Sequence, residues 1–380
     1  MGSDLVIRVL QVVTYMGRGG LETVLMNYYR HIDRTQVQFD FLVHRNFEAD
    51  YDAEIRRMGG RIYPVSRLIP WSLRYRRELK CFFQSHPEYR IIHVHQDCLS
   101  AVALQCAQQC GIPVRIAHSH TSKQDRNFRY LIKLYYRRKI PEFATDLYAC
   151  GSSAGEWMFG AHPFRVLPNA IDLSAYRWSP ERSCKVRRQW QLSGSTVIGH
   201  VGRFDALKNH SFLLDVFAAF LNRIPDAKLL LIGDGPERAK MEEKAASLHI
   251  RDKVIFTGTR GDVPDLMQAM DLFLFPSLYE GTPVVMIEAQ ASGLPCVKSD
   301  GVPEDCIVTS GLVTTMHLSD SPQTWAEHLV ERIKTLRGDH SAEIRAAGYD
   351  IELEARKLQN EYLRKYWEAV RGREEKAGCP

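Results

Sequence analysis

Two glutamates at an eight-residue spacing are the side chains of this 380-residue sequence best placed to bind a ligand. The apolar run 271–275 predicts a buried parallel strand, and Glu280 follows it in a short loop. Thr282 as N-cap and Pro283 as first helical residue predict a helix start, with Glu288 about two turns along the helix. A helix N-terminus at the carboxyl edge of a sheet attracts anions, and nearby carboxylates suit sugar and ribose hydroxyls. The segment predicts a nucleotide-sugar site; the alternative is an ordinary turn with two solvated glutamates.

A basic loop follows the first strand-like run of the second half of the chain. Arg203 comes directly after Gly202, and Lys208 lies five residues further on. Arginine can bind a phosphate through two parallel N–H groups, and the ammonium group of lysine is a compact positive charge. Together on a strand-to-helix loop they suit the two phosphates of a diphosphate. Both cations would stabilise the negative charge that develops on a departing nucleotide. The alternative is a solvated basic loop that binds no ligand.

A glycine-rich loop follows the first strand-like run of the chain and opens a helical pattern. Gly17, Gly19 and Gly20 would let the backbone approach a ligand closely. A nicotinamide dinucleotide site uses a similar loop, but here Glu22 occupies the position of its third glycine. The loop therefore indicates a phosphate contact or, alternatively, a turn that contacts no ligand.

Four histidines form two H-x-H pairs, His93 with His95 and His118 with His120. Residues two apart on a strand point to the same face of the sheet, so each pair could supply half of a metal site. Only Asp97 or Cys98 could complete such a ligand set from nearby in the sequence. Satisfied histidines near a ligand cleft are the alternative, and we expect no metal.

Strand-like runs alternate with helical patterns along the whole sequence. The runs of the first half are 7–13, 39–43, 91–94 and 114–116, with helical patterns at 22–31 and 100–110. Those of the second half are 197–202, 228–232, 254–257, 272–275 and 295–298. This alternation predicts an α/β protein of two doubly wound, Rossmann-like domains, with ligands at the carboxyl edges of the strands and the active site between the domains.

Composition limits the class of protein. A hydrophobic content of 45% and a charged content of 25% are typical of a globular protein, and no run is long enough to span a membrane. Nine cysteines without a C-x-x-C pair argue against a disulfide framework, and with no visible signal peptide they favour a cytoplasmic location. Residues 1–170 carry 23 basic and 15 acidic side chains, a net +8, whereas the rest carry 27 and 30, a net −3. The first half is thus the expected partner of an anionic surface.

The motif E-G-T-P-x4-E at 280–288 resembles the E-x7-E motif of retaining glycosyltransferase family 4, whose members have the GT-B fold. The phosphate-binding loop G-R-F-D-A-L-K-N-H at 202–210 and the segment L-P-N-A-I-D at 167–172 also resemble that family, although Leu167 and Ala170 stand where it often has valine and glycine. The resemblance implies an acceptor-side domain at 1–170 and a donor-binding domain at 171–352 that face each other across a cleft. It also implies a C-terminal helix at 353–380 that crosses back and packs on the first domain.

The resemblance also implies roles for individual residues. His120 would contact the donor sugar, with His118 as the other candidate, and Arg203, Lys208 and Glu280 would complete the catalytic set. The donor-binding residues would be Gly17, Gly19, Gly20, Gly202, Arg203, Lys208, Gly258, Thr259, Val263, Glu280, Gly281, Thr282, Pro283 and Glu288. Within this set the backbone around Gly258 and Thr259 would receive the nucleobase. No metal and no other cofactor is expected, because the two cations would neutralise the diphosphate.

The function that follows is retaining, metal-independent transfer of a hexose from a nucleotide diphosphate sugar, most simply a UDP-sugar, to a hydroxyl acceptor. Similarity to bacterial exopolysaccharide and capsule enzymes makes a lipid-linked glycan the expected acceptor. The alternatives are a GT-B sugar-nucleotide epimerase, a non-catalytic nucleotide-sugar binder, and a nicotinamide-dependent oxidoreductase, which would need a complete dinucleotide motif. The sequence does not specify the sugar, the base, the linkage or the oligomeric state.

Two stretches of mixed basic and apolar residues lie in the first half, at 67–77 and 123–139. The second holds seven basic residues against a single acid, Asp125, with tyrosines and leucines between them. Such stretches suit an anionic membrane surface or a phosphorylated lipid. Nucleic acid is the competing partner, but no nucleic-acid-binding motif accompanies the charge. We expect peripheral contact with the inner face of the cell membrane; the alternative is a solvated helix face.

Overall fold

The computed structural model describes residues 6–121 and 130–377. The chain divides into two compact units, the first formed by residues 1–170 and 351–380 and the second by residues 171–350.

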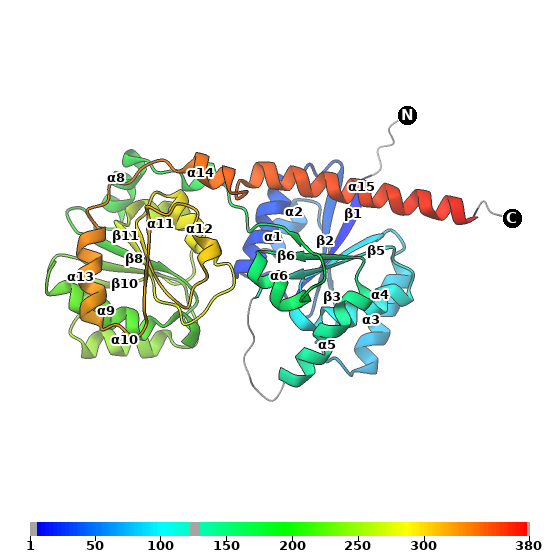
Figure 1. Cartoon of the computed structure of the whole chain (residues 1–380), viewed down its shortest axis with the longest axis horizontal. Helices are drawn as coiled ribbons and strands as arrows, with labels where there is room; N and C mark the ends of the chain where they lie inside the picture. The colour runs from blue at the N-terminus through cyan, green and yellow to red at the C-terminus, as the bar shows by residue number, and fades with distance from the viewer. Residues whose placement is uncertain (1–5, 122–129, 378–380) are drawn as a thin grey trace. The chain divides into compact units, whose positions relative to one another are not determined.

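The first unit is built on a sheet of seven parallel strands in the order β3-β2-β1-β4-β5-β6-β7 (Figure 1). The strands are β1 (Ile7–Val12), β2 (Val37–Val43), β3 (Ile62–Pro64), β4 (Ile91–Val94), β5 (Val114–Ser119), β6 (Asp146–Ala149) and β7 (Arg165–Val166). The central strands are almost fully buried, as expected for a parallel sheet covered on both faces. The strand order reverses between β1 and β4, which is where a doubly wound sheet binds its ligand.

The helices of the first unit lie on both faces of this sheet. They are α1 (Gly20–His31), α2 (Asp52–Arg57), α3 (Leu73–Ser85), η1 (Asp97–Leu99), α4 (Ser100–Gln109), α5 (Tyr130–Phe143), α6 (Ser152–Phe159) and α15 (Ile351–Ala377). Helix α15 was predicted from composition and family resemblance, and it packs on α1 and on strands β1, β2 and β5 (Figure 1). Its Tyr362 is fully buried there.

The second unit contains a sheet of six parallel strands in the order β10-β9-β8-β11-β12-β13. The strands are β8 (Val197–Val201), β9 (Lys228–Ile232), β10 (Val254–Phe256), β11 (Leu272–Phe275), β12 (Cys296–Ser299) and β13 (Val313–Met316). The order again reverses, here between β8 and β11. The two predicted ligand loops, 202–208 and 276–283, directly follow these two strands.

The helices of the second unit cover both faces of its sheet. They are α7 (Leu173–Tyr176), α8 (Pro180–Gln189), η2 (Ala206–Lys208), α9 (His210–Leu221), α10 (Arg238–Ser247), η3 (Arg251–Lys253), α11 (Val263–Ala269), α12 (Val284–Ala291), η4 (Glu304–Cys306), α13 (Pro322–Arg332) and α14 (Ser341–Ala346). Trp325 and Phe217 anchor one core layer and are fully buried.

The two predicted parallel sheets are confirmed, but β3, β6, β7 and β13 were not predicted. These strands are only two to four residues long and lie at or near a sheet edge, so their apolar patterns are too short to stand out. In the described parts of the chain, no helix is both long and apolar enough to cross a membrane.

Candidate functional site

The loop after β11 leads into helix α12, but the helix begins one residue later than predicted. Pro283 has an extended ψ of 114° and occupies the N-cap position, so Val284 is the first helical residue. No side chain caps this end, and the prediction that Thr282 is the N-cap is therefore wrong. Glu288 is the fifth residue of the helix, just over one turn in. The backbone N–H groups of the first turn remain the groups that an anion would meet.

Helix α12 ends in a tight C-terminal turn at Gly293. Gly293 has a φ of +65°, its N–H donates to Gln290 at 2.9 Å, and the Leu294 N–H donates to Ala289 at 3.0 Å. This double hydrogen bond is the Schellman arrangement, which satisfies the last carbonyls of a helix. Because both ends are fixed, the position of Glu288 relative to the sheet edge is also fixed.

Lys208 and Glu280, which come from the two predicted ligand loops, form an ion pair. Lys208 Nζ lies 2.5 Å from Glu280 Oε1 and 5.2 Å from the centre of the Phe275 ring. The loops are joined by two further bonds: the Leu278 N–H donates to Leu207 O at 2.8 Å, and Asn209 Nδ2 donates to Pro276 O at 3.2 Å. The two charged side chains are 19% and 14% exposed, so the pair is partly shielded from solvent yet reachable by a ligand.

Close packing requires a glycine at position 202, where the predicted phosphate-binding loop 202–208 begins. A Cβ on Gly202 would lie 2.8 Å from His200 Nε2, and a Cβ on Gly233 would lie 2.0 Å from Gly202 O. Arg203 is exposed at this turn. Asp205 accepts hydrogen bonds from the Leu207 and Lys208 N–H groups and so fixes the short helix η2 that carries Lys208.

Glu288 is buried against a partner that the sequence analysis missed. Tyr176, at the end of α7, donates its hydroxyl to Glu288 Oε1 at 2.6 Å. Burial raises the pKa of Glu288 to about 7, although the Tyr176 hydrogen bond opposes the shift. A buried tyrosine hydroxyl needs a partner, but nothing local in the sequence points to one 112 residues away.

The predicted nucleobase segment follows β10. Gly258 has a φ of +72°, and its carbonyl accepts a 3.0 Å hydrogen bond from the Gly233 N–H. Thr259 is exposed, whereas Val263 is half-buried as the first residue of α11. The bond to Gly233 places this segment beside the loop after β9, at the same carboxyl edge as the Lys208 loop.

In the first unit, the glycine-rich loop leads directly into α1. Gly19 is the N-cap, and Gly20 is the first helical residue; both are exposed, whereas Gly17 is buried. A Cβ on Gly19 would lie 2.2 Å from Glu22 Oε2, so the glutamate side chain turns back toward the start of the helix. Burial raises the pKa of Glu22 to about 7.

The two H-x-H pairs meet at the ends of the adjacent strands β4 and β5. The rings of His93 and His95 are 4.3 Å apart between centres, and those of His118 and His120 are 4.0 Å apart, so each pair does share one face. Burial lowers the pKa of His120 to about 3 and the pKa values of the other three well below the ordinary value. All four rings are therefore neutral at pH 7.

Hydrogen bonds link the rings in two branches. His93 Nδ1 lies 2.6 Å from the Tyr362 hydroxyl, and His93 Nε2 lies 3.1 Å from His118 Nδ1. In the other branch, His95 Nδ1 lies 2.9 Å from His120 Nε2, and His95 Nε2 lies 2.9 Å from Gln11 Oε1. A cavity of about 10 Å³ adjoins the rings, about the space for one water.

Three of the histidines lie close enough together to bind a metal ion, but their rings are not oriented as metal ligands. Ring nitrogens of His93, His95 and His118 all lie within 4.8 Å of one another. The His93 ring, however, stacks at 27° and 20° on its two neighbours, and both of its nitrogens are engaged in hydrogen bonds. A bound ion would require those bonds to break, so the expectation of no metal is retained as a prediction.

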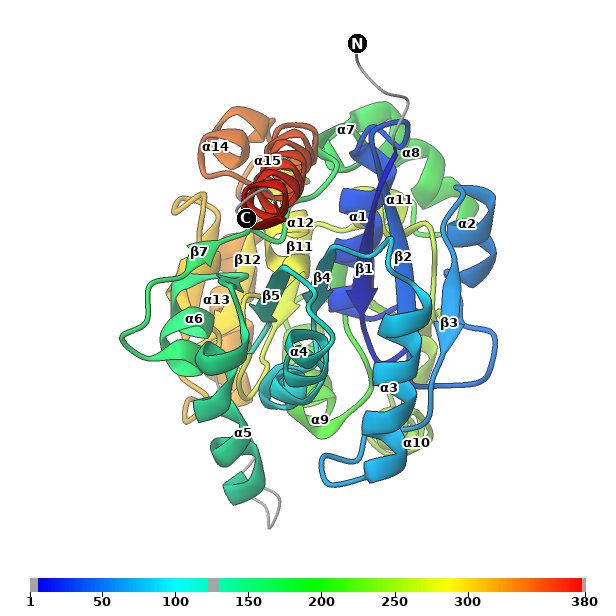
Figure 2. The same cartoon turned by 90° about the vertical axis from the view of Figure 1, so that its right-hand side faces the viewer.

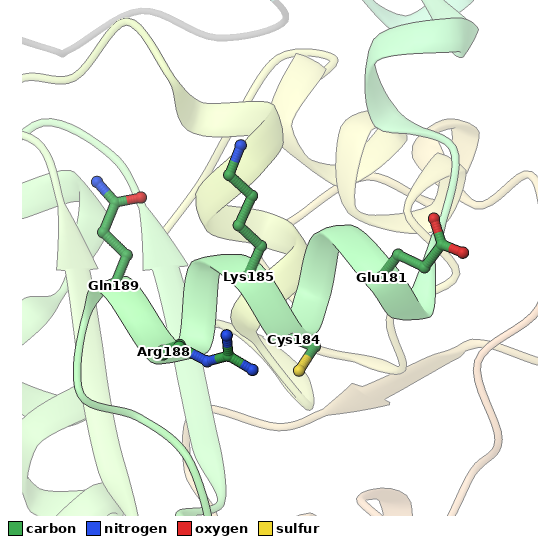
Figure 3. A pocket seen from close by; sticks show the side chains of 5 residues that line it. All are labelled: Glu181, Cys184, Lys185, Arg188 and Gln189. Atoms are coloured by element: carbon green, nitrogen blue, oxygen red, sulfur yellow. The ribbon is translucent and has the colours of Figure 1, made fainter.

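A separate hollow of about 530 Å³ lies along α8 in the second unit (Figure 3). Its lining side chains all come from that one helix, namely Glu181, Cys184, Lys185, Arg188 and Gln189. They carry mixed charges and project from the helix in different directions (Figure 3). Because none of them belongs to a strand end or a ligand loop, the hollow is not part of the candidate site.

Comparison with known proteins identifies the class that this fold and these loops define. Residues 18–175 match the model of Glycosyltransferase Family 4, and residues 195–336 match that of Glycosyl transferases group 1. EpsF of Bacillus subtilis (strain 168), provisionally named a glycosyltransferase, is 36% identical over 93% of this chain and 96% of its own length. The chain belongs to glycosyltransferase family 4.

More distant relatives and solved structures agree with this membership. An Escherichia coli enzyme named UDP-Gal:alpha-D-GlcNAc-diphosphoundecaprenol alpha-1,3-galactosyltransferase is 25% identical over 58% of this chain and 60% of its own length. The crystal structure of HepE from Anabaena in complex with UDP covers 93% of this chain and 99% of its own, with a TM-score of 0.77 at 18% identity. The fold is GT-B, and the protein is a glycosyltransferase of that type.

Proposed function

We propose that this glycosyltransferase moves a sugar from a UDP-sugar to a hydroxyl acceptor with retention of configuration. The observation that carries the proposal is the Lys208–Glu280 ion pair beside the start of α12. An ammonium group, which suits a diphosphate, and a carboxylate, which suits a sugar hydroxyl, thus lie close to one helix N-terminus, and this supports the proposal. Glu288, held by Tyr176, would accept hydrogen bonds from the ribose.

The proposed mechanism uses no protein nucleophile. Arg203 and Lys208 stabilise the charge on the leaving diphosphate, so the bond to the sugar breaks toward these cations. The acceptor attacks from the same face, and a phosphate oxygen of the donor takes its proton. Gly281 and Thr282 provide backbone against the sugar and the β-phosphate. On this account transfer needs no divalent ion.

The names of relatives support the choice of donor and acceptor. HepE is described in complexes with UDP and with UDP-glucose, and the Escherichia coli enzyme is named for UDP-galactose and a diphosphoundecaprenol-linked acceptor. A relative from Salmonella typhi is named for Vi polysaccharide biosynthesis. We therefore propose a lipid-linked glycan acceptor in the synthesis of a surface polysaccharide.

A screen of UDP-, GDP- and ADP-sugars with EDTA present tests the donor and the metal together. We expect one UDP-sugar to raise the melting temperature and to be hydrolysed slowly to UDP, because binding to the folded state alone stabilises it. Release that requires added Mg²⁺ would contradict the metal-independent mechanism. Stabilisation without release of nucleotide would favour a non-catalytic binder, and conversion of the donor into an isomeric sugar nucleotide would favour the epimerase.

The predicted membrane surface is formed by the described parts of the two basic-apolar stretches. Residues 123–129 lie outside the described residues, and the remainder of that stretch lies in α5. The most exposed apolar side chains of these two stretches are Trp71 just before α3, Leu73 at the start of α3, and Leu131 and Tyr135 on α5, at 67%, 82%, 75% and 59% exposure. Exposed Arg74 and Arg138 lie on the same two helices. The mixture of apolar and cationic groups suits an anionic lipid surface.

A hydrogen bond links α5 to the loop that leads into α3, close to the exposed side chains of both stretches. The Tyr136 hydroxyl of α5 donates to Pro70 O at 3.2 Å, and the Arg76 guanidinium of α3 donates to the same carbonyl. Helix α4 packs against both α3 and α5 and lies between them (Figure 2). We propose that this α3–α5 face contacts the membrane that holds the acceptor.

Sedimentation with vesicles tests the α3–α5 face. We expect the full chain to bind vesicles containing phosphatidylglycerol and to be released by salt, because basic residues near an anionic surface each contribute about 1 kcal/mol. Trp71→Ala should weaken this binding several-fold. Trp367→Ala is the matched control, because Trp367 is a 40% exposed tryptophan on α15. Equal binding to neutral and anionic vesicles would contradict the proposal.

A further inference from the structure

Lys298 is a fully buried lysine near the end of β12, in the second unit. It pairs in register with Phe275, the last residue of β11, so it lies beside the strand that leads into the Glu280 loop. A lysine is almost never fully buried unless its ammonium group is paired. Here Nζ donates to Val302 O at 2.8 Å and to Glu304 Oε1 at 2.7 Å. Both acceptors belong to the segment that directly follows β12.

A gain in stability does not account for this buried ammonium group. Glu304 is 72% exposed, so water competes for its carboxylate and weakens the pair. Replacing a buried ion pair with apolar side chains of similar volume is often neutral or stabilising. Lys298→Met would also leave no buried charge without a partner, because Glu304 is already in contact with solvent. The two bonds of Lys298 instead fix the position of residues 300–304.

Residues 300–304 pack directly on the loop 276–283. A Cβ on Gly301 would lie 2.1 Å from Leu278 O and 3.0 Å from Ser277 O, so the two backbones are in contact at this point. No side chain fits between them, and the close approach therefore requires a glycine at position 301.

The contact continues from loop 276–283 to the loop that carries Lys208. The Leu278 N–H donates to Leu207 O at 2.8 Å, and Glu280 forms the ion pair with Lys208. Strands β8, β11 and β12 are neighbours in the sheet, so the loops that follow them lie in a row at its carboxyl edge. Lys298 fixes the third loop of this row.

We propose that Lys298 is a positioning residue that holds residues 300–304 against the Glu280 loop. The loop held in this way keeps Glu280 and Lys208 in the arrangement that a sugar nucleotide meets. A site that is ordered before its ligand arrives loses less conformational entropy on binding, so the ligand binds more tightly. The identity of the ligand rests on the proposed function, whereas the coupling of the loops does not.

Hydrogen exchange of the full chain without ligand tests this coupling. We expect Lys298→Met to speed the exchange of backbone amides in 276–283 and 300–304 by about tenfold, the effect of one lost hydrogen bond to a charged group. The melting temperature should change by only a few degrees. Faster exchange throughout the second unit would overturn the inference, because it would report a general loss of stability.

Lys244→Met is the matched control for the exchange experiment. Lys244 Nζ also donates to one backbone carbonyl, Ser211 O at 2.9 Å, and to one carboxylate, that of Asp215 at 2.6 Å. These bonds join α10 to α9 and touch neither ligand loop. The inference is also overturned if Lys244→Met speeds the exchange of 276–283 as much as Lys298→Met does.

Gly301→Ala tests whether Lys298 acts through the contact with Leu278. The added methyl group would push the two loops apart while the Lys298 side chain remains. Gly301→Ala and Lys298→Met should each weaken binding of the donor by about tenfold, and the double variant should bind it no more weakly, because one contact is lost in all three. Gly311→Ala is the control, since a Cβ on Gly311 would meet no atom within 4 Å. Fully additive effects would overturn the inference.

These experiments also separate the inference from the proposed function. If no sugar nucleotide binds, the proposed function fails, and hydrogen exchange alone decides whether Lys298 orders the loops. If Lys298→Met binds the donor as tightly as the unmodified protein, the proposed function stands and the positioning role does not.

Discussion

Replacing Lys208 with methionine is expected to lower kcat for sugar transfer by about 10²- to 10³-fold. Removal of one fixed charge that stabilises a developing anion has an effect of this size, and methionine retains most of the apolar stem above Phe275. The substrate KM should change much less, because the charge on the diphosphate increases as the glycosidic bond breaks. Steady-state release of nucleotide from the donor identified in the screen measures both constants.

Lys244→Met is the matched control for this substitution. Lys244 is a partly buried lysine of the same unit, and its Nζ lies 2.6 Å from an Asp215 oxygen, but it lies on α10 rather than at the carboxyl edge. We expect its kcat to stay within a few-fold of the unmodified protein. If Lys208→Met transfers sugar as fast as Lys244→Met, Lys208 has no role at the leaving group.

Glu280→Gln should change nucleotide and sugar-nucleotide binding in opposite directions. Without a ligand, Glu280 holds the cation that the diphosphate needs, so neutralising it frees Lys208 and should tighten the binding of UDP alone. The same change weakens hydrogen bonds from the donor sugar, since a charged acceptor forms the stronger bond. Calorimetry with UDP and with the intact donor measures the two effects. Near-full transfer by Glu280→Ala would contradict the role assigned to this carboxylate.

Glu288→Gln changes the free energy of unfolding, and we expect this change to depend on pH. It should favour the folded state by about 3 kcal/mol more at pH 8 than at pH 4.5. The pKa of Glu288 is raised to about 7 by burial, whereas an unfolded glutamate titrates near its ordinary value. The folded state therefore binds the proton more tightly, and this contribution to stability is fully present below about pH 4.5. It is lost as the pH rises through about 7, where the buried carboxyl must ionise.

Denaturant unfolding of the unmodified protein and of Glu288→Gln at the two pH values measures this effect. The difference between the two proteins cancels the titration of other groups, and the amide oxygen can still accept from Tyr176. The affinity for the donor should depend on pH in the opposite direction to the stability. Ribose hydroxyls bind the ionised carboxylate better, so the affinity should rise toward pH 8. In Glu288→Gln this rise should be absent. A stability difference that does not vary with pH would mean that Glu288 keeps its ordinary pKa.

Local patterns were sufficient to predict the framework of this protein. The run 271–275 became the buried strand β11, and the loops that start at Gly202 and at Pro276 followed the two central strands of the second sheet. Apolar runs and turn residues act over a few positions, so one sequence reveals them. The exact start of α12 was mispredicted at Thr282, because two adjacent residues can both serve as helix-start signals and only the backbone angles decide between them.

The pairing of the functional side chains was decided by the tertiary structure. Lys208 meets Glu280 across 72 residues, Tyr176 meets Glu288 across 112, and Tyr362 meets His93 across 269. Each contact depends on which strands are neighbours in the sheet and on where α7 and α15 pack, and no local pattern specifies either. The sequence by itself determined which residues could bind a nucleotide sugar. The fold decided which cation faces which carboxylate, and which buried tyrosine holds Glu288.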